Sequence, residues 1–293
     1  MKCLIKLISL SFLICSALYV FSGVVRATDR DEKSLNYLVV GFDSAPANTD
    51  VLCVASYDCE ANTVRAVQIP RDSVIKYGDD YLKINAYYSK KVLEGATHQA
   101  ALGALSGKIS ELLGIEIDGY LAVSQEGLVS FVDFLGGVYV SESDIPKELS
   151  GSFEVEDGKV FLDGDDAIEF VRYRKEYTRG DLDRLDAQKT FIKSLVARIG
   201  ERRELFSILR FASENDGISF EANKGRSFSI LLDNVFKISN ADFQISTLPG
   251  EAKKHNGVWY YLVNREKSIA LISGYFPHLR NEFDTKRDFI YNF

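Results

Sequence analysis

Three short apolar segments near the start of the chain constrain its fold more than any other feature. They are NYLVVGF (36–42), VLCVASY (51–57) and the run from Val64 to Ile69, and each has the length and composition of a buried strand. Only the turn-forming cluster DCEAN (58–62) separates the second from the third. We therefore expect these two strands to form an antiparallel hairpin.

Helical patterns follow these strands and alternate with further strand-like segments. Apolar residues recur at helical spacing in 97–113 and 181–199. Shorter helices are expected at 125–135, 163–171, 205–212, 228–238 and 268–275, and further strands at 120–123, 138–140, 243–248 and 258–263. No linker divides these elements. We expect one α/β domain over residues 34–280, with a mixed central sheet flanked by helices, and a surface tail over 281–293.

The first 33 residues are set apart by composition. The run from Leu7 to Val25 contains no charged residue and is just long enough to cross a bilayer as a helix. The small-residue pattern ending at Ala27 also fits a cleaved signal peptide, but the apolar run is longer than usual for one. We therefore expect an N-terminal transmembrane helix over part of residues 1–33. Basic residues flank it on both sides, so they leave its orientation open.

The charge and the cysteines exclude some classes of protein. The net charge of −7 argues against a nucleic-acid binder, which is usually basic. Two of the four cysteines, Cys3 and Cys15, belong to the N-terminal segment. Cys53 and Cys59 are six residues apart and are expected to be two small thiols rather than a disulfide. The three histidines are far apart in sequence, and no Cys/His pattern is typical of a metal site.

The helix expected at 181–199 has charged and polar residues on its apolar side. Asp181, Arg184 and Gln188 fall on the face that Leu185, Phe191 and Leu195 would bury. A buried arginine needs a partner, because an unpaired buried charge costs several kcal/mol. An ordinary salt bridge is one explanation. An anion site is the other, because four arginines lie within thirteen residues and the guanidinium group binds phosphate oxygens in pairs; these are Arg172, Arg174, Arg179 and Arg184.

Further polar residues stand at strand ends. Asp43 directly follows the first strand, and Asp50 directly precedes the second. If the two strands are neighbours, a short loop would bring both carboxylates to one edge, and Mg²⁺ accepts such oxygen ligands. Taken alone, each aspartate is better explained as an ordinary turn residue. In AVQIPRDS (66–73), Pro70 ends the third strand and Arg71 follows it. Lys83 is either a further hydrogen-bond donor at this site or part of a turn before a helix.

The ordered set of these segments resembles the LytR-CpsA-Psr family of cell-envelope proteins. The matching pieces are VVGFDS, NTDVLCVASYD, AVQIPRDS, LKINAYY, ELLGIEIDGYLAV, FVDFLGGVYV, LDGDDAIEFVRYR, GDLDRLDAQ and TLPG. No single piece is specific, but the order is. The resemblance implies an enzyme held in the cell membrane by a single helix, with its domain on the outer, cell-wall side.

The resemblance also implies a reaction and a site. Such proteins move a glycopolymer from a polyprenyl-pyrophosphate carrier to peptidoglycan, leaving a phosphodiester link. Mg²⁺ at the pyrophosphate and an apolar pocket for the prenyl chain are expected. By position, Asp43 and Asp50 would hold the metal. The pyrophosphate would be bound by Arg71, Arg172, Arg174, Arg184, Gln188 and Lys83. Among these residues, Arg71, Asp50 and Arg184 are the expected catalytic groups.

Three positions depart from the family pattern. Asn48 and Ala187 stand where the family usually has arginine, and Val51 stands where it usually has threonine. These departures keep two other hypotheses open. One is a hydrolase of the same lipid pyrophosphate, which would need the same residues. The other is a non-catalytic envelope protein that binds lipid-linked precursors as a scaffold or regulator.

Overall fold

The structure, a computed structural model, describes residues 34–42, 48–145, 149, 151–173, 181–202, 204–222, 237, 241–276 and 289. The predicted N-terminal transmembrane helix (1–33), most of the C-terminal tail and most of the helix expected at 228–238 lie outside these ranges. Within them, no helix has the length and apolar character needed to cross a membrane.

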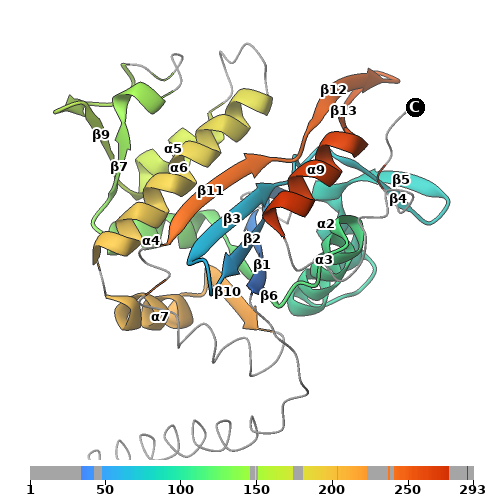
Figure 1. The fold of residues 1–293 in the computed structure, drawn as a ribbon, viewed down its shortest axis with the longest axis horizontal. Coiled ribbons are helices and arrows are strands. Elements are labelled where there is room, and N and C mark those ends of the chain that lie inside the picture. Colours follow the sequence, from blue (N-terminus) through green and yellow to red (C-terminus); the bar gives the residue numbers. More distant parts are fainter. Residues whose placement is uncertain are drawn as a thin grey trace, which may run out of the picture.

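A six-stranded mixed sheet forms the centre of the fold (Figure 1). Its strand order is β10-β6-β1-β2-β3-β11. The strands are β1 (Ser34–Phe42), β2 (Thr49–Asp58), β3 (Thr63–Gln68), β6 (Gly119–Val123), β10 (Ile218–Ala222) and β11 (Asp242–Thr247). The predicted hairpin is confirmed, because β2 pairs antiparallel with β3. The sheet is mixed because β6 pairs parallel with β1, and β11 parallel with β3.

Side chains that alternate along the strands pack into different cores on the two faces of the sheet. Leu38 and Val40 belong to the larger core, in which helix α3 (His98–Leu113) buries Leu102, Leu105 and Ile109. Cys53 belongs to a smaller cluster on the opposite face, where Ile192 of α6 (Asp181–Arg202) packs. Period-two alternation in a two-sided sheet thus gives a helix–sheet–helix arrangement.

Most helices on the α6 side pack around a second core. These helices are α4 (Gln125–Phe134), α5 (Gly164–Arg172) and α6. A small sheet packs with them and consists of β7 (Val138–Ser141), β8 (Val155–Glu156) and β9 (Lys159–Leu162). Helix α7 (Leu205–Glu214) contacts β10. Ser124 and Asp163 start α4 and α5 as N-caps, each accepting a hydrogen bond from a backbone N–H three residues later.

Two hairpins extend from the end of the sheet where β3 terminates. One is β4 (Val74–Tyr77) with β5 (Asp80–Lys83), and the other is β12 (Gly250–His255) with β13 (Val258–Val263). A parallel bridge between Ser73 and Tyr261 joins them, and both lie at the upper right of Figure 1. After β5 come a 3₁₀ turn (Ile84–Ala86) and α2 (Tyr87–Leu93), as expected for LKINAYY.

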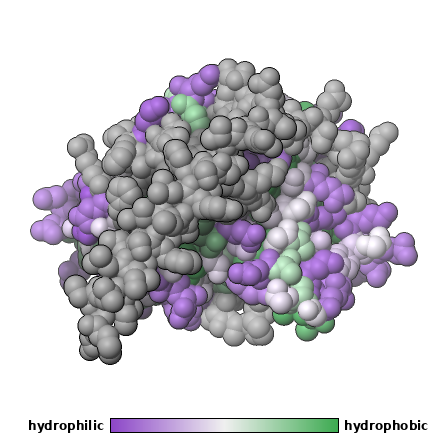
Figure 2. All heavy atoms as spheres, turned by 90° about the horizontal axis from the view of Figure 1, so that it is seen from below, coloured by the Kyte–Doolittle hydropathy of each residue, from purple (hydrophilic) through white to green (hydrophobic). Residues whose placement is uncertain are grey.

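The sequence-based elements agree well with the structure, with some boundary differences. The last helix, α9 (Arg265–Tyr275), starts three residues before the expected 268 because Asn264 caps it. Cys53 and Cys59 are free thiols, as expected. Viewed from below, the described surface is mainly polar, with a pale to green strip on the side where α2 and α3 lie (Figure 2).

Candidate active site

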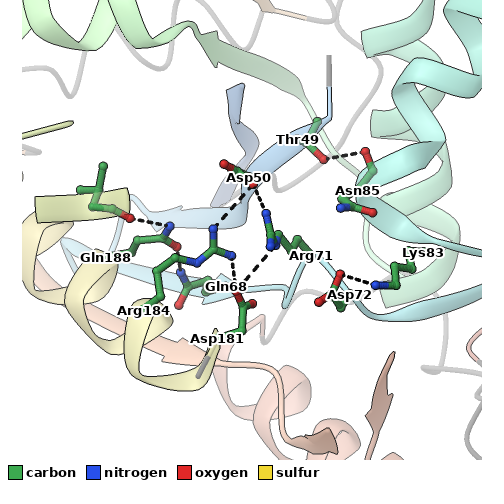
Figure 3. Close-up of polar contacts among 11 residues, drawn as sticks. Thr49, Asp50, Gln68, Arg71, Asp72, Lys83, Asn85, Asp181, Arg184 and Gln188 are labelled. Atoms are coloured by element: carbon green, nitrogen blue, oxygen red, sulfur yellow. Dashed lines mark hydrogen bonds and ion pairs between the residues drawn. The ribbon is translucent and has the colours of Figure 1, made fainter. Parts of the chain in front are cut away.

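Two of the expected catalytic residues meet at the end of the sheet where β3 terminates. Asp50 is the second residue of strand β2, and Arg71 lies just beyond β3. Since β2 and β3 run antiparallel, the start of one lies beside the end of the other. The Nη1 of Arg71 accordingly donates a hydrogen bond to Oδ1 of Asp50 (Figure 3). The sequence alone did not settle this contact; the strand directions do.

Arg184 reaches the same carboxylate from helix α6. It is completely buried, as its position on the predicted helical wheel indicated. Its Nη2 lies 2.7 Å from Oδ1 of Asp181, and its Nη1 lies 3.6 Å from Oδ1 of Asp50. Asp181 also lies 3.7 Å from Nε of Arg71. The four residues therefore form one cluster with alternating charges, which we call the arginine–aspartate cluster.

The cluster is shielded from water to different depths. The side chain of Arg184 is 1% exposed, that of Asp50 11%, that of Arg71 17% and that of Asp181 30%. Burial by itself would lower the pKa of Arg71, but the carboxylates of Asp181 and Asp50 outweigh it and raise that pKa. The guanidinium group of Arg71 therefore stays charged.

Gln188 lies one turn further along α6 and is buried in a hydrogen-bond network. Its Oε1 accepts from Nε2 of Gln68 at 2.9 Å, and its Nε2 donates to the backbone oxygen of Val171 at 3.3 Å. Oε1 of Gln68 accepts in turn from Oγ1 of Thr247. Gln188 thus ties α6 to β3 and to the end of α5. Its expected role as a pyrophosphate ligand stays a prediction.

Lys83 lies on the opposite side of Arg71. Its Nζ is 3.0 Å from Oδ1 of Asp72, the residue after Arg71 (Figure 3). The backbone supports this arrangement, because the N–H of Asn85 donates to the carbonyl oxygen of Arg71 at 3.0 Å. Thr49 donates to the carbonyl oxygen of Asn85. The segment that carries Lys83 is therefore fixed to both strand ends of the site.

The other expected ligands are placed differently. Arg172 ends α5, is exposed, and donates from Nη1 to Oε1 of Gln125 at 3.0 Å. Arg174 and Asp43 lie outside the described residues. Phe42, which precedes Asp43, pairs with Thr49, so the chain enters the undescribed loop at the same sheet edge as Asp50.

The two positions that lack the family's arginine have different surroundings. Asn48 is exposed, and its Oδ1 accepts from Oγ of Ser89 at 3.3 Å. Ala187 is 1% exposed and belongs to the second core, together with Phe170 and Phe191. In this chain position 187 is therefore a packing site between helices, whereas position 48 borders open solvent.

A cavity of about 630 Å³ opens next to the start of α6. Leu182 and Leu185 of the helix line it on one side, and the TLPG segment (247–250) lines it on another. Charged side chains also line it, among them Asp186, Lys189 and Glu251. This lining does not match the apolar pocket expected for a prenyl chain, which stays a prediction.

The donor set of the site is compatible with Mg²⁺. That ion is usually held by one or two carboxylates and completed by water and substrate phosphate oxygens. Asp181 supplies carboxylate oxygens at the more open end of the cluster, and the largely buried Asp50 supplies them deeper inside. Among the described residues, no group of three or more His, Cys, Asp and Glu side chains is placed to hold a metal. The residues therefore fit a shared site with substrate rather than a closed protein cage.

Asp181 is the functional candidate that sequence reasoning missed. Its signal was present, since the helical wheel placed it on the inward face with Arg184. In the structure it contacts both arginines of the cluster.

Comparison with known proteins decides the family. A profile of the LytR_cpsA_psr family matches residues 20–272. The chain belongs to this family. A similar curated relative is the polyisoprenyl-teichoic acid–peptidoglycan teichoic acid transferase TagU of Oceanobacillus iheyensis, 25% identical over 86% of this chain and 78% of the relative. The cell wall biosynthesis protein LcpA of Corynebacterium glutamicum is 29% identical over 75% of this chain, which spans 44% of that relative.

Solved structures show the same fold. TagT bound to LI-WTA has a TM-score of 0.66 and 20% identity, over 87% of this chain and 95% of that one. The protein gbs0355 from Streptococcus agalactiae has a TM-score of 0.68 and 19% identity, over 86% of this chain and 90% of that one. The predicted fold, a mixed central sheet flanked by helices in the manner of this family, is confirmed.

Proposed function

We propose that this family member is a phosphotransferase that moves a glycopolymer from a polyprenyl-pyrophosphate carrier onto peptidoglycan. The observation that supports this most is the convergence of Arg71 and Arg184, from two distant parts of the chain, on one strand-end carboxylate. The guanidinium group of Arg71 at the more open side of the cluster, with that of Arg184 fixed behind it, would suit a pyrophosphate group. The named activities of the TagU relatives give the substrate class.

The residues of the chain would act mainly by positioning and by charge stabilisation. Arg71 and Arg184 would hold pyrophosphate oxygens and stabilise the charge that builds on the departing prenyl phosphate. A peptidoglycan hydroxyl would attack the phosphorus next to the glycan. A new P–O bond forms to the acceptor oxygen, and the bond to the prenyl phosphate breaks. The hydroxyl proton would pass to a carboxylate, Asp43 or Asp50.

Mg²⁺ would be held by Asp50 and Asp43. Asp181 belongs to the same cluster as Asp50, since both carboxylates pair with Arg71. When bound, the ion would neutralise pyrophosphate charge. A readout other than turnover is available. Inorganic pyrophosphate should raise the melting temperature more with Mg²⁺ than without it, and Asp50→Asn should reduce that difference.

We also propose that the N-terminal segment anchors the protein in the cell membrane as a single helix, with the domain on the wall side. The polyprenyl carrier is a membrane lipid, so an anchored domain would meet its substrate at the bilayer. Labelling of an introduced cysteine in the domain by a membrane-impermeant reagent on intact cells would test this orientation.

The function is tested with a synthetic prenyl-pyrophosphate glycan, Mg²⁺ and a peptidoglycan oligomer, followed by mass analysis. Arg71→Ala and Arg184→Ala should each abolish transfer while the domain stays folded. Arg210→Ala is the control, because Arg210 is exposed and pairs only one turn away with Glu214 among the contacts described. Near-normal turnover in either site variant would refute the assignment. Glycan-independent release of prenyl phosphate would instead identify a hydrolase.

A further inference from the structure

An aromatic surface lies next to the arginine–aspartate cluster, on the hairpins β4–β5 and β12–β13. Tyr81 and Tyr260 meet edge to face, with ring centres 6.1 Å apart and planes at 78°. Nζ of Lys83 lies 5.4 Å from the centre of the Tyr260 ring. Tyr81 is 43% exposed, although large aromatic side chains are usually buried. We call Tyr81, Tyr260 and Lys83 the hairpin face.

Strand alternation separates this face from the other side of the β12–β13 hairpin. Tyr260 pairs with Lys253 across the hairpin, and Trp259 pairs with Lys254. Consecutive residues of a strand point to opposite faces, so Trp259 and Tyr260 diverge. Trp259 is 57% exposed, with Lys254 at 6.0 Å from its ring centre. Trp259 and Tyr260 thus have different surroundings, and only Tyr260 joins the hairpin face.

The hairpin face is continuous with the candidate active site. Lys83, which lies over Tyr260, also pairs with Asp72 at 3.0 Å. Asp72 follows Arg71 directly, and its carbonyl oxygen accepts a hydrogen bond from the N–H of Tyr261 at 2.9 Å. In Figure 3, Asp72 and Lys83 lie on the side of Arg71 away from Gln188. A polymer that reacts near Arg71 therefore has a partly exposed surface along which to extend.

We propose that the hairpin face binds the glycan strand of the acceptor peptidoglycan. This inference rests on the proposed transferase function. Exposed aromatic rings pack against the C–H groups on the flat side of a sugar ring, which are weakly positive and meet the negative ring face. Two rings and a lysine that start at the reaction site would hold consecutive sugars and present a hydroxyl to the pyrophosphate.

The charges of the hairpin face favour the acceptor over the donor polymer. Lys83 is compensated by Asp72, and Lys253 has Glu251 two residues away on the same side of its strand. Lys76, paired with Tyr81, adds a single further cation. A polyphosphate donor would need roughly one cation for each bound phosphate. A strand of neutral sugars with scattered carboxylates needs aromatic rings and only a few lysines, which is the composition found here.

The test is binding of full-length protein in detergent to peptidoglycan stripped of attached polymers, measured by co-sedimentation. Replacing both Tyr81 and Tyr260 by alanine should weaken binding about tenfold, as expected for loss of two modest ring contacts. Trp259→Ala is the matched control and should bind as the parent does. Purified teichoic acid and liposomes are the competing probes. Tyr81→Leu, which keeps apolar bulk, covers the case in which the double variant fails to fold.

The possible results separate this proposal from the proposed function. If the parent binds peptidoglycan through the two tyrosines but never transfers a polymer, the hairpin face stands and the transferase assignment fails. If the parent transfers polymer while the tyrosine variants keep the same KM for acceptor, the hairpin face is refuted. Loss of teichoic acid or liposome binding in the tyrosine variants, with peptidoglycan binding unchanged, would also refute it.

Discussion

Replacing Arg184 by methionine should abolish the proposed transfer yet change stability little. Arg184 is the most deeply buried charge of the cluster, at 1% side-chain exposure. At an effective dielectric constant of about 20, each ion pair near 4 Å is worth roughly 4 kcal/mol, while taking the guanidinium out of water costs several kcal/mol. The two terms nearly cancel, because Asp50 and Asp181 both keep Arg71 as a partner when Arg184 is removed. Methionine adds roughly 2 kcal/mol of apolar burial, so we expect a net change within about 2 kcal/mol.

Removing a carboxylate should cost much more than removing this arginine. Asp181→Asn deletes the pair at 2.7 Å and leaves Arg184 buried with only Asp50, at 3.6 Å, among the pairs described. Breaking a buried pair from one side typically costs about 3–5 kcal/mol. In a domain of this size, the two variants should differ in melting temperature by roughly 5–10 °C.

Urea unfolding and thermal melting, both followed by far-ultraviolet circular dichroism at pH 7, measure the free energy of unfolding and the melting temperature of both variants. Lys189→Met is the control on the same helix, since it removes a partly exposed pair with Asp186 and should change stability by less than about 1 kcal/mol. If Arg184→Met proves less stable than Asp181→Asn, the assumption that desolvation of Arg184 offsets its pairing is wrong.

Three further predictions concern packing, pH and the departures from the family pattern. Gly127→Ala should lower the melting temperature and Gly103→Ala should not, because an added Cβ would lie 2.4 Å from the Gly217 carbonyl oxygen in the first case and in open space in the second. Burial raises the pKa of Cys53 to about 12, so the folded state keeps a proton that the unfolded thiol loses from about pH 9. The free energy of unfolding should therefore fall between pH 9 and 12, and it should fall less steeply in Cys53→Ala. Asn48→Arg should fold normally and bind inorganic pyrophosphate more tightly in calorimetry, whereas Ala187→Arg, which buries a charge beside Phe170, should fail to fold.

The sequence patterns of single helices and strands were sufficient to predict where the site residues on those elements lie. The helical period placed Arg184 inside, and it is fully buried. Strand ends located Asp50 and Arg71, and they meet because β2 and β3 are antiparallel neighbours. For Arg184 the sequence of its own helix carried the information, and for Asp50 and Arg71 the short connection between β2 and β3 fixed the pairing.

Contacts between segments that are far apart in the sequence, or that lack an apolar pattern, could not be predicted in this way. The strand β12 has the sequence GEAKKH, which contains no apolar alternation, so the β12–β13 hairpin was not predicted in full. Consequently nothing in the sequence placed Tyr260 near Tyr81, which is far from it along the chain. The side chain of Arg172 also turned out to contact Gln125, because the packing of α5 against α4 sets its direction.

The structure changes how the missing family arginines are interpreted. Ala187 fills a space between α5 and α6 that an arginine could occupy only by repacking the second core, so its absence follows from local packing. What remains at the described site is two arginines balanced by two carboxylates. A balanced cluster does not attract an anion by net charge. Affinity for pyrophosphate must then depend on the fixed direction of the guanidinium groups and on a cation that takes over the carboxylate oxygens, and this makes the proposed Mg²⁺ a requirement for binding as well as for catalysis.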